Sequence, residues 1–173
     1  MRAPPLFLFI ALLTVSICAF SKEVFRSKDW TVVYESSYQE AYTSNKSRSS
    51  IGVFCVVSSS NCFYYLETKL RCKKKEEIPA LISADIGAYS DTLICTPIRT
   101  KRGVKYVYVF SNYNVIMKAL IKGIRIGVVI PTETGQFKVS RFSLRGSRNA
   151  IQAARTIKNR VRRPKPSSKD IYL

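Results

Sequence analysis

The chain contains no histidine, and this absence limits the chemistry open to it. Histidine is the usual general base at neutral pH and the most frequent metal ligand in proteins. Without it, Ser-His-Asp and Cys-His catalysis are excluded. The sequence also lacks a Gly-rich phosphate loop and a dinucleotide-binding fingerprint. We therefore expect a protein that is not an enzyme, binds no small-molecule substrate and requires no cofactor.

Acidic residues are scarce in this chain. It has 11 Asp and Glu against 29 Lys and Arg, which gives a formal net charge of +18. The acids are scattered, and Asp85 and Asp91 occupy turn-like positions that need no catalytic explanation. Such a positive excess favours association with anionic material: lipid headgroups, lipopolysaccharide, acidic polysaccharide or nucleic acid. The alternative interpretation is that the charge only keeps the protein soluble.

Long apolar runs are lacking beyond the N-terminus. There, residues 6–15 are apolar apart from one Thr, with Arg2 before them and the small residues Ser16, Cys18 and Ala19 after them. This order is typical of a cleaved secretory signal peptide. The run is too short for a permanent transmembrane helix, which needs ~20 residues. We predict that residues 1–19 are a signal peptide and that the mature protein is exported, either periplasmic or secreted.

Cysteine is present at five positions, of which Cys18 lies in the predicted leader. The remaining disulfide candidates are Cys55, Cys62, Cys72 and Cys95. No Cys-x-x-Cys pair occurs, and without histidine a metal site is disfavoured. An even number in an oxidising compartment favours two disulfides, for which three connectivities exist. Spacing alone does not choose among them, and we favour the local pairing of Cys55 with Cys62 and of Cys72 with Cys95.

The apolar pattern of the mature chain is mainly that of β-strands. The clearest strand is residues 104–110, in which both faces are apolar, as in a central strand between two layers. Residues 124–130 and 137–144 predict a hairpin. The polar, Ser-rich residues 38–50 predict an exposed loop. Further strands are predicted at residues 29–34, 51–57, 63–66, 81–86 and 93–98.

Two short helices are predicted in the second half of the chain. The first, residues 115–121, stops at Gly123 after a basic last turn. The second, residues 148–163, is preceded by Ser147 as a cap. The sequence therefore predicts a mainly β, antiparallel protein with two short helices, most simply a β-sandwich. We expect one domain over residues 22–163 and a basic flexible tail over residues 164–173.

The basic C-terminal segment is the main candidate for binding phosphates or sulfates. Its polyanion-binding candidates are Arg155, Lys158, Arg160, Arg162, Arg163 and Lys165. The alternative is a solvated helix face followed by a frayed end. The chain is also rich in tyrosine. These rings could stack on sugars or nucleic-acid bases, or they could pack against side chains of neighbouring strands.

Several short motifs resemble those of the invasion-associated locus B family of exported bacterial proteins. The opening strand has Asp-Trp-Thr-Val at residues 29–32, and a cysteine-bearing strand follows at Cys55. Residues 118–123 (Lys-Ala-Leu-Ile-Lys-Gly) resemble the family's helix-turn-strand segment. Residues 142–146 (Phe-Ser-Leu-Arg-Gly) resemble its closing motif, which leads into an Ala-rich helix. Ser147 stands where the family commonly has an aromatic residue.

The resemblance implies an immunoglobulin-like β-sandwich, export and a link to host-cell invasion, and it implies no catalytic mechanism. Our first hypothesis is a non-enzymatic exported interaction protein of the bacterial envelope or secretome. Its partner would be a protein at the envelope or on the host surface, with the basic tail adding attraction to anionic polymers or lipid headgroups. The second hypothesis is a secreted cationic protein that binds nucleic acid or another polyanion through its basic C-terminal helix.

Overall fold

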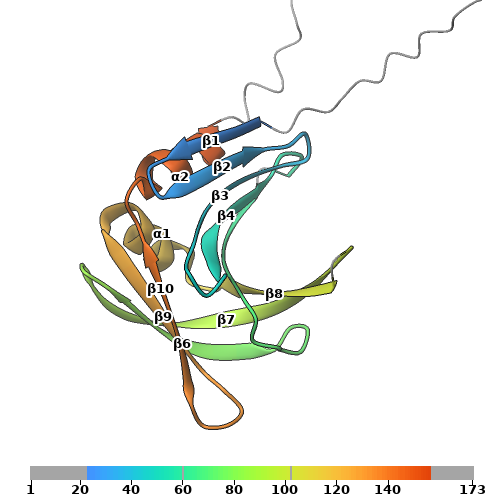
Figure 1. Cartoon of the computed structure of the whole chain (residues 1–173), viewed down its shortest axis with the longest axis vertical. Coiled ribbons are helices and arrows are strands. Elements are labelled where there is room, and N and C mark those ends of the chain that lie inside the picture. The colour runs from blue at the N-terminus through green and yellow to red at the C-terminus, as the bar shows by residue number, and fades with distance from the viewer. Residues whose placement is uncertain (1–22, 60, 102, 157–173) are drawn as a thin grey trace, which may run out of the picture.

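Ten strands and two helices make up the described part of the molecule (Figure 1). The structure is a computed structural model and describes residues 23–59, 61–101 and 103–156. The strands are β1 (Glu23–Ser27), β2 (Trp30–Tyr34), β3 (Tyr38–Ser44), β4 (Ser50–Val56), β5 (Cys62–Thr68), β6 (Glu77–Ala84), β7 (Gly87–Thr100), β8 (Gly103–Phe110), β9 (Arg125–Pro131) and β10 (Phe137–Ser143). The helices are α1 (Tyr113–Lys122) and α2 (Ser147–Thr156). The predicted leader, the end of the predicted second helix and the predicted tail lie outside the described residues.

All ten strands belong to one antiparallel sheet in the order β1-β2-β3-β4-β5-β8-β7-β6-β9-β10. The mainly β, antiparallel prediction with two helices is therefore confirmed. The strands do not form the two separate hydrogen-bonded sheets of the expected sandwich. Figure 1 shows instead that the single sheet curls strongly, so that its two ends approach each other. β8 lies between β5 and β7, which confirms its predicted central position.

The hydrophobic core lies on the inner face of the curled sheet. In β4, for example, Ile51, Val53 and Cys55 alternate inward and are completely buried. Both helices lie against this face. α2 contacts β1 to β4, and α1 contacts β5 and α2. The inward residues of the helices are fully buried: Ile116, Ala119, Leu120, Ala150, Ile151 and Ala154.

The prediction of an exposed loop over residues 38–50 is wrong. β3 occupies residues 38–44 of it, pairs with β2 and β4, and buries every second side chain. Two of those inward side chains are polar, since Gln39 is 1% exposed and Thr43 is 4% exposed. The Thr43 hydroxyl donates a hydrogen bond to the Asp29 carbonyl oxygen at 2.8 Å. Because two of the buried positions carry polar residues, the alternation of apolar and polar residues that indicates a strand is not visible in the sequence.

The first helix begins two residues earlier than predicted and ends at Gly123 as predicted. Asn112 caps α1, because its side-chain oxygen accepts a hydrogen bond from the Val115 backbone N–H at 3.2 Å. The predicted capping role of Ser147 is wrong. Its hydroxyl donates instead to the Leu120 carbonyl oxygen at 2.5 Å and ties α2 to the end of α1. The hairpin of β9 and β10 pairs over seven residue pairs and is confirmed.

The turn between β1 and β2 binds the segment that follows β10. We call this contact the closing contact. The indole N–H of the buried Trp30 donates to the Ser143 carbonyl oxygen at 3.1 Å, and the Ser143 hydroxyl donates to the Asp29 carboxylate at 2.6 Å. The Ser27 hydroxyl donates to the Gly146 carbonyl oxygen at 3.1 Å. The opening and closing motifs of the sequence therefore meet in space.

Gly146 has no room for a side chain in the closing contact. Its φ is +92°, and a Cβ atom there would lie 2.0 Å from the Ser27 carbonyl oxygen. We expect Gly146→Ala to lower the free energy of unfolding by about 2–4 kcal/mol, because left-handed strain and overpacking add. Gly135→Ala is the matched control, since Gly135 has φ +76° but open space around it. It should cost about 1 kcal/mol in urea unfolding, and equal losses for both variants would contradict this account.

Candidate interaction surface

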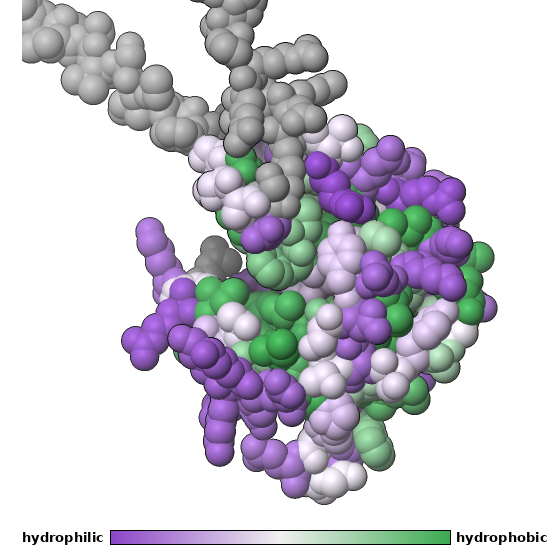
Figure 2. All heavy atoms as spheres, turned by 180° about the vertical axis from the view of Figure 1, so that it is seen from behind, coloured by the Kyte–Doolittle hydropathy of each residue, from purple (hydrophilic) through white to green (hydrophobic). Residues whose placement is uncertain are grey.

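The outer face of the sheet carries an apolar groove across β3, β4, β5, β8 and β7. We call it the outer groove. It has a volume of about 540 Å³. Seen from behind, the molecule shows a hollowed apolar area bordered by long hydrophilic side chains (Figure 2). The residues that line the outer groove are Tyr38, Glu40, Phe54, Phe63, Tyr65, Glu67, Thr96, Ile98, Thr100, Lys105, Val107 and Val109.

Strand alternation places these residues together on the face opposite the helices. Tyr108 and Phe110 of β8 point into the core, so Val107 and Val109 point outward. Sheet register then aligns Val109 with Tyr65 of β5. Within the described part of the chain, no second layer covers this face: Phe63 and Ile98 are each 45% exposed. One apolar face of β8 therefore packs into the core, and the other lines the open groove. The prediction that a layer covers each face of this strand is wrong.

The charged groups of the outer groove are paired with one another or with a phenol. Lys105 Nζ lies 2.9 Å from the Glu67 carboxylate. The Tyr65 hydroxyl donates a hydrogen bond to Glu40. Burial and then the neighbouring Glu40 carboxylate raise the pKa of Tyr65 well above its usual value, so this phenol keeps its proton. The groove therefore offers apolar contact with a few fixed polar groups.

Aromatic stacking gives the groove a rigid end. The rings of Tyr38 and Phe54 stack with centroids 4.8 Å apart and planes 21° apart. Burial and then the nearby Glu35 raise the pKa of Tyr38. Tyrosine and phenylalanine are enriched at the cores of protein interfaces, while charged residues are depleted there. The arrangement therefore suits binding of another macromolecule.

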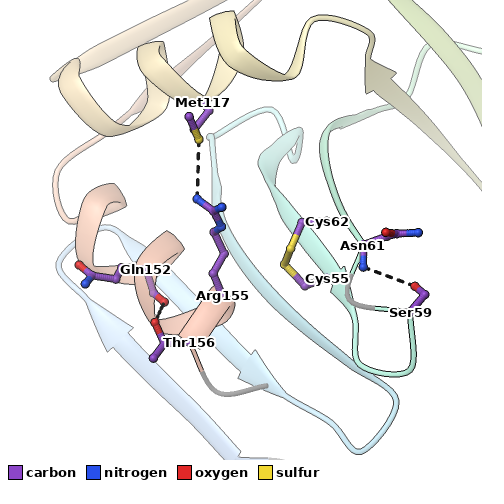
Figure 3. Close-up of a disulfide and its surroundings, with 8 residues drawn as sticks. All are labelled: Cys55, Ser59, Asn61, Cys62, Met117, Gln152, Arg155 and Thr156. Carbon is purple, nitrogen blue, oxygen red and sulfur yellow. Dashed lines mark hydrogen bonds between the residues drawn. A yellow bond between two sulfur atoms is a disulfide. The ribbon is translucent and has the colours of Figure 1, made fainter. Parts of the chain in front are cut away.

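The four cysteines of the described residues form two disulfides, Cys55–Cys62 and Cys72–Cys95. This is the local pairing favoured from the sequence. Cys55 and Cys62 face each other across β4 and β5, with Cα atoms 4.0 Å apart (Figure 3). The second disulfide connects the loop after β5 to β7 and spans 23 residues. Each closed loop stabilises the fold by ~2–4 kcal/mol, mainly by restricting the unfolded chain.

Of the predicted polyanion-binding residues, only Arg155 is described. It lies exposed on α2, and its guanidinium donates to the Met117 sulfur at 3.7 Å (Figure 3). The candidates Lys158, Arg160, Arg162, Arg163 and Lys165 lie outside the described residues.

Asp85 and Asp91, both predicted as turn residues, bind backbone N–H groups. Asp85 does lie in a turn, but the prediction for Asp91 is wrong, since it belongs to β7. The Asp85 carboxylate accepts hydrogen bonds from Ile124 at 2.7 Å and Arg125 at 3.0 Å, and these bonds lower its pKa. Asp91 accepts from Thr92 at 2.7 Å and from Asn112 at 3.0 Å. Both carboxylates hold chain connections in place. Among residues 23–59, 61–101 and 103–156, no three Cys, Asp or Glu side chains gather as metal ligands, and no helix has the length and apolarity to span a membrane.

The outer groove was not predicted from the sequence. Its residues come from five strands, and β5 pairs with β8 and not with β6, which follows it in the chain. The signal that was available is the doubly apolar pattern of residues 104–110. This pattern indicates a strand with two apolar faces, but it does not show whether the second face is buried in the protein or is a binding surface.

The fold has a solved counterpart. It is similar to the crystal structure of invasion associated protein B from Bartonella henselae, with a TM-score of 0.52 and 13% sequence identity. The likeness covers 76% of this chain and 95% of that chain. No family model and no curated protein matches the sequence. The likeness supports, at the level of the fold, the resemblance first seen in the short motifs.

Buried tyrosines make the stability of the protein sensitive to high pH. Burial and then the nearby Glu76 raise the pKa of Tyr108 to about 12, against 10.0 for a free phenol. A raised pKa in the folded state contributes stability that is complete below pH 10 and is lost as the pH rises toward 12. We expect the free energy of unfolding in urea to fall across this interval, and to fall less steeply in Tyr108→Phe. If the free energy of unfolding falls equally with pH in the two proteins, the raised pKa does not belong to Tyr108.

Proposed function

We propose that the protein is a non-enzymatic, exported bacterial interaction protein whose outer groove binds a partner protein at the bacterial envelope or on a host cell. The observation that carries the proposal is the open apolar groove lined by Tyr38, Phe54, Phe63 and Tyr65. Exposed apolar areas of this kind mark interaction sites on otherwise soluble proteins.

Export is supported by two independent features. The first is the pattern of the leader, with Arg2 before the apolar run at residues 6–15 and small residues after it. The second is the pair of disulfides, because such bonds persist in oxidising compartments and are rare in the cytosol. The fold shared with invasion associated protein B supports a link to host-cell entry.

The export proposal has a direct test in the intact mass of the protein purified from its own cells. We expect a mass that lacks residues 1–19, with no alkylation of cysteine before reduction and alkylation of four cysteines after it. A retained leader with free thiols would contradict export. It would also make intracellular binding of nucleic acid the leading hypothesis.

The groove proposal predicts that polar substitution of its exposed apolar residues weakens binding without unfolding the protein. Phe63→Ser with Ile98→Ser removes two side chains that are each 45% exposed. We expect binding of labelled protein to host cells or to isolated envelopes to weaken about tenfold or more, as for central interface residues. Because each side chain is about half buried, the double variant should lose about 2–3 kcal/mol of stability and remain folded, which urea unfolding checks.

A matched control separates groove binding from general surface hydrophobicity. Val24→Ser with Ile124→Ser removes two apolar side chains that are 51% and 61% exposed and lie outside the groove. This variant should bind as the unmodified protein does and should restore host-cell entry to a strain that lacks the protein. Equal loss of binding in both double variants would refute the assignment of the groove.

A further inference from the structure

A second surface lies on the opposite side of the sheet, where α1 and α2 meet. A furrow of about 440 Å³ runs between the two helices, and we call it the helix furrow. Its lining residues are Ile121, Arg148, Ile151, Gln152, Arg155 and Thr156. It shares no residue with the outer groove, so an inference about it stands independently of the function proposed above.

Two of the six residues that line the helix furrow are arginines, none is acidic, and two lysines lie near it on α1. Arg148 and Arg155 are exposed on one stripe of α2, seven residues or ~10 Å apart along the helix axis. Lys118 and Lys122 are exposed one turn apart on α1, beside Ile121. Neither helix contains an acidic residue. Within the described part of the chain, neither arginine forms an ion pair, and the Arg155 guanidinium contacts only the Met117 sulfur as a hydrogen-bond acceptor (Figure 3).

The acid-free region extends well beyond the helices in sequence. No Asp or Glu occurs between Asp91 and Glu133, or between Glu133 and Asp170. Packing holds the two helices in fixed positions: the Ser147 hydroxyl donates to the Leu120 carbonyl oxygen, and Ile151 is completely buried. The two packed helices therefore hold the basic residues of the furrow at a fixed spacing.

We propose that the helix furrow binds a sulfated polysaccharide. Guanidinium groups form paired, charge-assisted hydrogen bonds with sulfates and carboxylates, and two arginines at fixed spacing match anionic groups that repeat along a chain. Gln152 lies between the arginines on the same stripe and offers its amide to sugar hydroxyls. Ile121 lines the furrow beside them and packs against the apolar face of a sugar ring.

The lining of the furrow favours a polysaccharide over the other anionic partners. None of the lining residues is aromatic, whereas proteins that bind single-stranded nucleic acid stack its bases on aromatic side chains. The large apolar side chains that are exposed elsewhere on the molecule are absent from α1 and α2. Binding to a membrane interface needs such apolar anchors in addition to positive charge.

The test measures binding of a heparin-derived oligosaccharide to the full-length protein. Arg148→Gln with Arg155→Gln should weaken binding about tenfold or more, since hydrogen bonds between charged groups are lost. Arg26→Gln with Arg141→Gln is the matched control, because both residues are exposed, lie outside the furrow and remove the same charge. The control should lose much less affinity. Equal losses would show attraction by net charge alone and would overturn the proposal.

Three further arms separate the alternatives. A desulfated oligosaccharide of the same length should bind much more weakly than the sulfated one. A single-stranded oligonucleotide or phosphatidylglycerol vesicles that bind as tightly, with the same dependence on Arg148 and Arg155, would overturn the choice of ligand. A third variant carries glutamine in place of five basic residues, Lys158, Arg160, Arg162, Arg163 and Lys165, and should keep much of the binding. If this variant loses all binding while Arg148→Gln with Arg155→Gln loses none, the site lies in that segment and not in the furrow.

The conservative variant Arg148→Lys with Arg155→Lys keeps the charge and removes the planar fork. We expect it to bind with intermediate affinity, because lysine attracts sulfate as a point charge without paired hydrogen bonds. Urea unfolding of every variant checks the fold. If the glutamine variant is unstable, the lysine variant and Arg148→Gln alone carry the test, and unchanged affinity in both would refute the proposal.

Discussion

Trp30 and Gly146 belong to a contact between segments that are more than a hundred residues apart, and this contact holds the two ends of the curled sheet together. An open ten-stranded sheet would leave both end strands and most of one face in water. Here the turn after β1 hydrogen-bonds to the chain after β10, so the sheet curls and its inner face becomes a closed core. Because Gly146 touches the Ser27 backbone, no side chain fits there. The adjacent α2 is thereby directed onto the inner face.

The two helices are sufficient to cover only one face of the sheet. α2 packs on β1 to β4 and α1 packs on β5, so the inner face is filled by helix side chains that are completely buried. The outer face of the sheet receives no covering element in the described part of the chain, and it still carries Phe63 on β5, Ile98 on β7 and Val107 on β8. Exposed apolar area of this extent costs solubility and therefore calls for a functional explanation. The high net charge offsets that cost, since like charge keeps molecules apart.

Much of the fold could be predicted from local patterns, and the errors have identifiable physical causes. The hairpin of β9 and β10, the central strand β8 and the first helix depend on short-range patterns that are visible in the sequence. The disulfide pairing was favoured only because both loops are local, since spacing left three connectivities open. β3 was missed because Gln39 and Thr43 are polar and buried. The sandwich was inferred as the simplest architecture for a mainly antiparallel β chain with two short helices, and the strands form one curled sheet instead. The outer groove depends on the pairing of β5 with β8, and no local pattern encodes a pairing across 38 residues, the separation of Lys105 from Glu67.

The basic surface that attracts anionic material and the groove proposed to select a partner lie in different parts of the molecule. In the outer groove, Lys105 pairs with Glu67 and Tyr65 binds Glu40, so its charged groups are satisfied internally and its selectivity comes from shape and apolar contact. The positive excess is concentrated in acid-free stretches of the chain, including both helices. Coulombic attraction extends over about 8 Å at physiological ionic strength and increases encounter rates without specifying one partner. If both proposals hold, the basic helix face would concentrate the protein at anionic surfaces, and the opposite face, with the outer groove, would stay free for the proposed partner.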